Sequence, residues 1–252
     1  MTAVRAVVFD LGHTLWDFAP REESRRLKVV RLHERLSRAL DGAVPAPTEL
    51  DRALGATAQR WFESWIKQPE DLEQPPTERL IGEALASLAL SVSDDLLHEL
   101  TCIVFGAELD IPVMEPDSLA AIAGLHQRGL AMGCVTNTIT LEEGIHDALA
   151  RLGLRHYLRS VVASSAAGYR KPHPSLFLRA LEGLDVEPGE AVFVGDRLFD
   201  DVSGAQAVGM RAVLTHQYRQ EPLDGASVAP DAVIQRLGDL PAVIQRLNNR
   251  RA

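Results

Sequence analysis

The sequence has only two cysteines and no long apolar run. These scarcities argue against a cysteine-bound metal site and against a membrane protein. Its two cysteines, Cys102 and Cys134, lie in apolar surroundings without a metal-ligand spacing, which predicts two reduced thiols in the core. No apolar run approaches the roughly 18 residues of a membrane helix. The first stretch, MTAVRAVVFD, lacks the charged and apolar regions of a signal peptide. We therefore expect a cytoplasmic protein that does not enter a membrane.

Positive charge is also scarce. The formal net charge is −9, whereas a protein that displaces counterions from nucleic acid needs a surplus of lysine and arginine. We therefore expect no nucleic-acid partner. Lysine occurs only at Lys28, Lys67 and Lys171, so a lysine that meets an anionic substrate must be one of these three.

Apolar, β-branched segments recur along the chain, and each ends in a polar residue. They are AVVFD to Asp10, MGCVTN to Asn137, SVVASS to Ser165, AVFVGD to Asp196 and RAVLTH to His216. Segments of this kind are typical of buried strands in a parallel sheet. Helical patterns lie between them, for example SLAAIAGLHQRG from Ser118. The alternation predicts an α/β fold with a Rossmann-like, doubly wound parallel sheet.

The region from Trp16 to about Leu109 breaks this alternation and shows only helical periodicity. The expected helices span residues 22–40, 48–67, 78–89 and 94–105. Such helices can bury a small core of their own. We therefore expect a core domain of residues 1–17 and 112–252 and an inserted helical-bundle cap of residues 18–111. The linkers are expected near Phe18 and at residues 111–116.

Two smaller patterns also carry expectations. Trp61, Phe62 and Trp65 fall at helical spacing, and we expect a face packed inside the bundle rather than a substrate-stacking site. The hexapeptide AVIQRL occurs twice, from Ala232 and from Ala242. We expect the first copy to form an edge strand and the second a terminal helix, because context can override local preference.

The polar side chains at the strand ends form a set suited to phosphate chemistry. Asp10 offers a carboxylate, and Thr136 offers a hydroxyl beside Asn137. Lys171, in YRKPHP, offers an ammonium group, and VFVGDRLFDD holds an acidic cluster that begins at Asp196. Carboxylates at two strand ends suit Mg²⁺, which prefers oxygen ligands and often binds substrate phosphates. Phosphoryl transfer needs such a nucleophile, metal, hydroxyl and cation together.

These segments, in this order, resemble the four motifs of the haloacid dehalogenase-like (HAD) hydrolase superfamily. The matching segments are DLGHTL, VTN, RKP and GDRLFDD. The resemblance implies that Asp10 is the nucleophile, Thr136 the phosphate-binding hydroxyl and Lys171 the motif lysine. It implies an acidic metal motif in Asp196 and Asp201, and it makes the helical insert similar to the family's type-one cap. It further implies Mg²⁺-dependent hydrolysis of a small phosphorylated molecule through an aspartyl-phosphate intermediate.

Position 12 departs from the family pattern. Most phosphatases of the family carry a second aspartate two residues after the nucleophile as general acid, and here that residue is Gly12. Its backbone carbonyl, which relatives use as a metal ligand, is retained. The implied metal ligands are therefore Asp10, Gly12, Asp196 and Asp201. A positioned acid contributes about 10² to 10⁴ in rate, so its absence bears on which substrates react.

Three interpretations of this departure stay open. The protein is a phosphatase in which His13, the cap residue Asp17 or water supplies the proton. Alternatively, turnover is confined to good leaving groups such as acyl or aryl phosphates. In the third interpretation, the protein is a catalytically impaired phosphate-ligand binding or regulatory protein.

Two other chemistries of the family fit less well. Its 2-haloacid dehalogenases place a bulkier residue after the nucleophile and dispense with the metal, which disagrees with Gly12 and with the acids of GDRLFDD. Its phosphonatases use a cap lysine, for which Lys28 and Lys67 are available. The residues expected to bind substrate are Thr136, Asn137, Lys171 and His13, with Trp16, Asp17, Arg21 and Arg170 near the site by chain position. A monomer and a homodimer are both compatible with the sequence.

Overall fold

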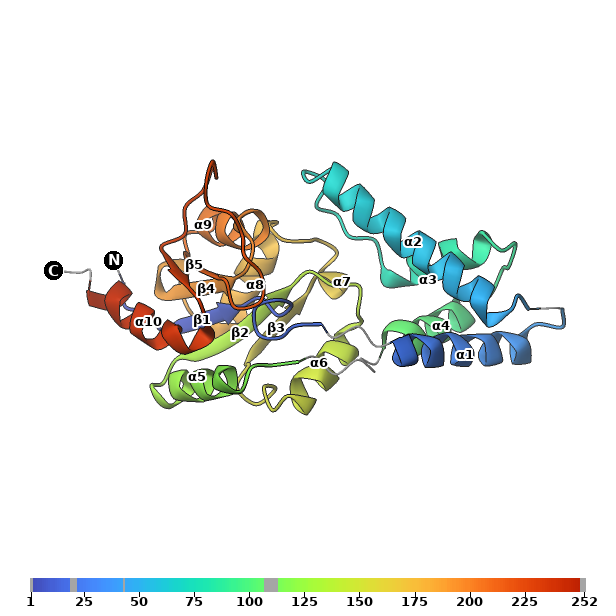
Figure 1. The fold of residues 1–252 in the computed structure, drawn as a ribbon, viewed down its shortest axis with the longest axis horizontal. Helices are drawn as coiled ribbons and strands as arrows, with labels where there is room; N and C mark the ends of the chain where they lie inside the picture. Colours follow the sequence, from blue (N-terminus) through green and yellow to red (C-terminus); the bar gives the residue numbers. More distant parts are fainter. Residues whose placement is uncertain (1, 19–21, 43, 107–112, 250–252) are drawn as a thin grey trace.

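The computed structural model describes residues 2–18, 22–42, 44–106 and 113–249. Its centre is a 6-stranded parallel sheet with the order β3-β2-β1-β4-β5-β6. The strands are β1 (Ala6–Phe9), β2 (Ala131–Thr136), β3 (Ser160–Ala163), β4 (Ala191–Gly195), β5 (Arg211–Thr215) and β6 (Ala232–Ile234). The predicted Rossmann-like, doubly wound α/β fold is confirmed (Figure 1).

The first strand lies in the middle of the sheet and is buried along its whole length. From β1 the chain moves outward to β2 and β3, and it then returns to pair β4 with the other edge of β1. This reversal is the point at which open α/β sheets bind ligands, outside the carboxyl ends of their strands. Asp10 follows β1 directly and therefore lies at that point.

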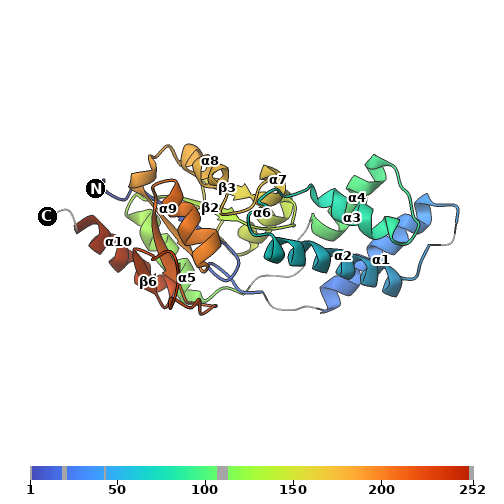
Figure 2. The ribbon, with the colours of Figure 1, turned by 90° about the horizontal axis from the view of Figure 1, so that it is seen from above.

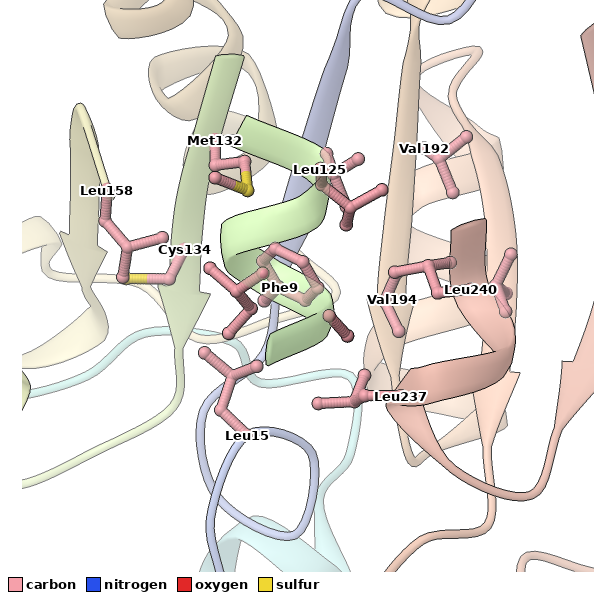
Figure 3. Close-up of a cluster of buried hydrophobic side chains, with 14 of the residues drawn as sticks. Phe9, Leu15, Leu125, Met132, Cys134, Leu158, Val192, Val194, Leu237 and Leu240 are labelled. Carbon is pink, nitrogen blue, oxygen red and sulfur yellow. The ribbon is translucent and has the colours of Figure 1, made fainter. Parts of the chain in front are cut away.

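Helices pack on both faces of the sheet. One face is covered by α5 (Pro116–Gln127), α6 (Glu142–Arg151) and α10 (Leu240–Asn249), and the other by α8 (Pro174–Leu184) and α9 (Gly204–Ala207). Shorter helical turns are α7 (Ser164–Ala167), η1 (Pro188–Glu190), η2 (Leu198–Ser203) and η3 (Leu237–Asp239). Figure 3 shows the apolar cluster between the sheet and the face covered by α5, α6 and α10. In this cluster Phe9 of β1 lies among Leu15, Leu125 and Val194. Among the described helices, none is both long and apolar enough to cross a membrane.

Four of the described helices lie between β1 and α5 and pack together. They are α1 (Glu22–Ala39), α2 (Pro47–Lys67), α3 (Thr77–Ala86) and α4 (Asp94–Phe105). They enclose a separate apolar cluster that includes Leu32, Leu50, Ile81 and Leu100, and they lie to one side of the sheet (Figures 1 and 2). The predicted helical bundle is therefore present. The domain limits at residues 17–18 and 111–112 stay a prediction, because residues 19–21 and 107–112 lie outside the described part of the chain.

The two chain segments that join the bundle to the sheet lie side by side. Asp17 and Val113 form an antiparallel bridge, in which the Asp17 amide donates to the Val113 carbonyl at 2.8 Å and the Val113 amide donates back at 3.0 Å. A second junction joins the α2–α3 connection to the loop before Lys171. There the Gln74 amide donates to the Gly168 carbonyl, and the Arg170 amide donates to the Leu72 carbonyl.

Two expectations about apolar side chains are wrong. The aromatic face of α2 is not packed inside the bundle: Phe62 is 46% exposed, and Trp61 and Trp65 are half-buried. The buried residues of α2 all lie in its first half, and its second half projects beyond α3 toward the sheet domain (Figure 1). Cys134 is buried as expected, but Cys102 is exposed. Leu100 and Val104 of α4 face the cluster, and helical phase turns position 102 away from it.

The repeated hexapeptide adopts both expected structures. Its first copy supplies the edge strand β6, which pairs with β5, and its second copy lies in the terminal helix α10. In α10 the residues Val243, Ile244 and Leu247 are buried against the sheet at helical spacing. Identical residues thus form a strand or a helix according to what they pack against.

Candidate active site

The loop after β1 is held by its own apolar residues. Leu11 and Leu15 are fully buried, and the Leu11 carbonyl accepts hydrogen bonds from the amides of Thr14, Leu15 and Trp16. The Asp10 amide donates to the Val194 carbonyl at 2.9 Å, which extends the pairing with β4 by one residue. The turn places His13 in the left-handed region with a φ of 57°. Asp10 is therefore presented from a fixed backbone.

A lysine lies between two of the carboxylates. The Lys171 Nζ donates to the Asp10 Oδ1 at 2.5 Å and to the Asp201 Oδ1 at 2.7 Å, and the lysine side chain is only 3% exposed. Asn137 fixes the backbone at this position: its Oδ1 accepts from the Lys171 amide at 2.7 Å, and its Nδ2 donates to the Lys171 carbonyl at 3.2 Å. Because both polar atoms of Asn137 are engaged with this backbone, its side chain positions the lysine.

The acidic segment after β4 forms a turn in which its last carboxylate, that of Asp201, accepts hydrogen bonds from amides at its start. The Asp201 Oδ2 accepts hydrogen bonds from the amides of Asp196 and Arg197, both at 3.0 Å. This closure requires a glycine at position 195, because a Cβ atom there would lie 2.3 Å from the Asp201 carboxylate carbon. The Asp196 carboxylate then faces the carboxyl end of β1, where the Thr14 hydroxyl lies 3.5 Å from its Oδ1. Asp196 also forms an ion pair with Arg219, whose Nη1 lies 2.9 Å from the Asp196 Oδ2.

The crowding of buried charges changes their proton affinities. Burial raises the pKa of Asp10 to about 6, although Lys171 opposes the shift. Burial, together with the neighbouring Asp10 and Asp201, raises the pKa of Asp196 to about 8. Burial alone would lower the pKa of Lys171, but Asp10 and Asp201 outweigh it and hold that pKa above its usual value. The lysine is therefore an ammonium ion, and the carboxylates require additional positive charge to ionise together.

The donor set fits a hard divalent cation. Asp10, Asp196 and Asp201 each offer a carboxylate oxygen, and these atoms lie within 4.8 Å of one another. All three residues are buried, and oxygen ligands at this density match the preference of Mg²⁺. Such a cation would also relieve the repulsion that raises the pKa of Asp196.

Gly12 lies against an aromatic ring. A Cβ atom at position 12 would be 2.7 Å from Cε2 and 2.8 Å from Cζ of Phe18, so this ring occupies the space that a side chain would need. Phe18 is 54% exposed, and its ring contacts the His13 imidazole edge to face at 5.4 Å. The His13 Nδ1 in turn lies 3.0 Å from the Asp17 Oδ1. Burial and the nearby Arg219 lower the pKa of His13.

One cavity of about 210 Å³ collects the predicted site residues. Its lining includes all eight of them: Asp10, Gly12, His13, Thr136, Asn137, Lys171, Asp196 and Asp201. Of the residues placed near the site by chain position, Trp16 lines the cavity and Asp17 contacts His13. Arg170 instead packs over the Trp65 ring at 4.5 Å, at the junction with the bundle. Arg21 lies outside the described residues.

Comparison with known proteins settles the family. The family model described as haloacid dehalogenase-like hydrolase matches residues 4–209. The chain belongs to the HAD-like hydrolases. It is 27% identical over 258 residues to a glyceraldehyde 3-phosphate phosphatase of Methanopyrus kandleri. This alignment covers 97% of this chain and 98% of that protein.

Two further comparisons place this HAD-like hydrolase among its relatives. It is 32% identical over 189 residues to haloacid dehalogenase-like hydrolase domain-containing protein 3 of Mus musculus, covering 74% of this chain and 68% of that protein. The crystal structure of a 2-haloacid dehalogenase from Pseudomonas syringae superposes with a TM-score of 0.66 at 27% identity, covering 97% of this chain and 99% of that chain. Relatives of this hydrolase thus carry both phosphatase and dehalogenase names.

The sequence did not point to several other residues that line the cavity. They are Phe18, Thr138, Thr140, Ile145, Arg197 and Arg219; Asp200, which the sequence placed in the acidic cluster, lines the cavity as well. Asp200 and Arg197 pair with each other at 3.2 Å, and both lie inside the acidic motif, so the motif itself signals them. Arg219 comes from the loop after β5, which matches no HAD motif, so nothing in its local sequence brings it to Asp196.

Proposed function

We propose that this HAD-like hydrolase is a Mg²⁺-dependent phosphatase that cleaves a small phosphorylated molecule through an aspartyl-phosphate intermediate on Asp10. The observation that carries the proposal is the buried cluster of Asp10, Asp196 and Asp201 around the Lys171 ammonium. A carboxylate nucleophile with two further acids beside it suits a metal-assisted attack on phosphorus. Phosphatase names among the relatives support the same reaction class.

The first step is attack on phosphorus by Asp10. Lys171 holds the Oδ1 oxygen at 2.5 Å, and we assign the attack to Oδ2. A bond forms between this oxygen and phosphorus, and the bond from phosphorus to the leaving oxygen breaks. We assign to Thr136, which is buried at the end of β2 and lines the cavity, the donation of its hydroxyl to a phosphate oxygen. Bound Mg²⁺ supplies positive charge that neutralises the phosphoryl oxygens.

The second step returns Asp10 to its starting state. A water oxygen attacks the phosphorus of the aspartyl phosphate, and the bond from phosphorus to the Asp10 oxygen breaks; both protons of the water leave with the phosphate as dihydrogen phosphate, and the carboxylate is restored. Asn137 holds the Lys171 backbone through both steps, so we assign it a positioning role rather than the substrate contact expected from the sequence. Lys171 reduces the repulsion between the Asp10 carboxylate and an anionic substrate.

Protonation of the leaving group decides which substrates react. The Phe18 ring fills the space beside Gly12 where relatives carry an acid, and a ring of carbon atoms donates no proton. Burial and Arg219 lower the pKa of His13, which reduces the imidazolium population near neutral pH. Of the interpretations left open by the sequence, we therefore favour turnover that depends strongly on a good leaving group.

The similarity to a solved 2-haloacid dehalogenase supports a second candidate, in which Asp10 attacks a carbon atom that bears a halogen. The three buried carboxylates favour the phosphatase, since displacement of a halide from carbon needs no metal, whereas oxygen ligands at this spacing suit a divalent cation. A phosphonatase reaction has less support, because neither Lys28 nor Lys67 is among the residues that line the described cavity. Lys67 is 72% exposed and pairs with Glu63.

One set of assays separates these functions. Hydrolysis of p-nitrophenyl phosphate, acetyl phosphate and a panel of alkyl phosphates is measured with Mg²⁺ and with EDTA, and chloride release from 2-chloropropionate is measured in parallel. We expect metal-dependent turnover that is fastest on the aryl and acyl phosphates. Chloride release without phosphate release would establish the dehalogenase. No turnover of either kind by folded protein would favour the phosphate-binding protein.

A further inference from the structure

Arg219 contacts Asp196, one of the three carboxylates that would hold the proposed metal. Its Nη1 is 2.9 Å from the Asp196 Oδ2, and its side chain is 33% exposed whereas that of Asp196 is 3% exposed. We propose that Arg219 is a built-in cation that competes with the metal for Asp196 and leaves this carboxylate when the metal binds. The inference rests on the proposed function, because it assumes that Asp196 is a metal ligand.

The distribution of charge explains why such a cation is needed. Three buried carboxylates meet at the site, and Lys171 pairs directly with two of them, Asp10 and Asp201. A buried carboxylate without a partner is strongly unfavourable. Arg219 places an opposite charge beside Asp196, and this charge lowers the pKa that burial and the neighbouring carboxylates raise.

The loop that carries Arg219 is fixed on both sides of it. The Gln217 Nε2 donates to the Ser118 Oγ at 3.0 Å, and the Gln217 Oε1 accepts from the Leu237 amide at 2.8 Å. On the far side, the Glu221 Oε1 accepts from the Leu198 amide at 3.3 Å. The residues two positions before and two positions after Arg219 are thus tied through their side chains to three separate segments.

The residue before Arg219 adds another tie, because the Tyr218 hydroxyl accepts from the Glu115 amide at 2.9 Å. With the backbone held, the guanidinium reaches the acidic cluster from a fixed point. Its movement on metal binding therefore needs only a change of side-chain rotamer. A side chain that is one-third exposed has room for that change.

A divalent cation and a guanidinium cannot both gain fully from one carboxylate oxygen. Two cations within a few ångströms repel each other, and the repulsion is strong where solvent is excluded. When the metal displaces the Arg219 contact, the lost ion pair lowers the apparent affinity for the metal. Because coupling between two binding events is reciprocal, bound metal weakens the ion pair of Asp196 with Arg219 by the same free energy by which this ion pair weakens metal binding.

Mn²⁺ serves as the probe, because its free concentration can be measured by electron paramagnetic resonance without substrate or turnover. Titrations are made with the wild type and with Arg219→Gln. Arg197→Gln is the matched control, since Arg197 lines the same cavity but pairs with Asp200. We expect Arg219→Gln to bind Mn²⁺ at least about fivefold more tightly than the wild type, the low end of typical coupling between two sites. Arg197→Gln should change the affinity much less.

Arg219→Lys keeps a positive charge at the same position, so its affinity should lie between those of the wild type and Arg219→Gln. Circular dichroism melts verify that each variant is folded, and Arg219→Lys gives the comparison if Arg219→Gln is unstable. Equal affinities of the wild type, Arg219→Gln and Arg219→Lys, or equal gains for Arg219→Gln and Arg197→Gln, would overturn the inference while leaving the metal site intact. Absence of Mn²⁺ binding in every variant would overturn the proposed function as well.

Discussion

Replacing Gly12 by aspartate tests how the missing acid limits the reaction. A Cβ atom at this position lies 2.7 Å from Cε2 of Phe18, whereas carbon atoms pack favourably at about 3.5 to 4.0 Å. The ring must therefore move by about 1 Å. Because Phe18 is 54% exposed, it can turn toward solvent, and an off-rotamer side chain costs about 0.5–1.5 kcal/mol.

The gain exceeds this cost. A positioned general acid is worth about 10² to 10⁴ in rate, or roughly 3 to 5 kcal/mol. We therefore expect Gly12→Asp to raise kcat/KM on alkyl phosphates by about ten- to a thousandfold. The p-nitrophenyl ester should gain little, because its leaving group departs without a proton. Adding Phe18→Ala removes the clash, so the double variant should exceed Gly12→Asp on alkyl phosphates by up to about tenfold.

Steady-state kinetics of four proteins on both substrate classes complete this cycle: the wild type, both single variants and the double variant. Gly12→Ala is the control, because it introduces the same Cβ contact with Phe18 but no acid. It should raise the rate on neither substrate class. Equal gains by Gly12→Asp on alkyl and aryl phosphates, or gains matched by Gly12→Ala, would show that leaving-group protonation does not limit the rate.

Three further outcomes are expected. Asp10→Asn should abolish turnover with an unchanged circular dichroism spectrum, and residual activity near that of the wild type would mean that the nucleophile is another residue. Asn137→Ala should lower kcat and reduce the free energy of unfolding in urea by about 1–3 kcal/mol, because two hydrogen bonds to the Lys171 backbone are lost. In the native protein, 5,5′-dithiobis(2-nitrobenzoate) should label Cys102 and leave Cys134 unlabelled, since Cys102 is exposed and burial raises the pKa of Cys134 to about 12. Reaction of both thiols at similar rates before unfolding would contradict the packing of β2.

Much of the fold could be predicted because its signals are local. Apolar runs that stop at a polar residue located five of the strands, and the order of those strands along the chain placed their ends at one edge of the sheet. Asp10 was found in this way, and Lys171 from the RKP segment, although the two residues are 161 positions apart. Helix ends were predicted less well: α3 ends at Ala86, and Ala89, the predicted last residue, has a φ of 56°.

The features that the sequence did not predict depend on packing between distant segments. Arg219 reaches Asp196 because its loop is tied to α5, η2 and η3, and none of these ties has a local signal. The contact of Phe18 with Gly12 depends on how the chain turns after β1. Cys102 was placed in the core from its apolar neighbours alone, and the phase of α4 shows why that argument fails.

The most direct test of the account is to trap the covalent intermediate. The protein is mixed with Mg²⁺ and acetyl phosphate, quenched in acid during turnover and reduced with borohydride, which converts an aspartyl phosphate into homoserine. Peptide mass spectrometry then locates the conversion. We expect homoserine at position 10 in the wild type, with conversion lost on addition of EDTA and in Asp10→Asn. Turnover without any conversion at Asp10, or conversion at Asp200 or Asp201 instead, would contradict it.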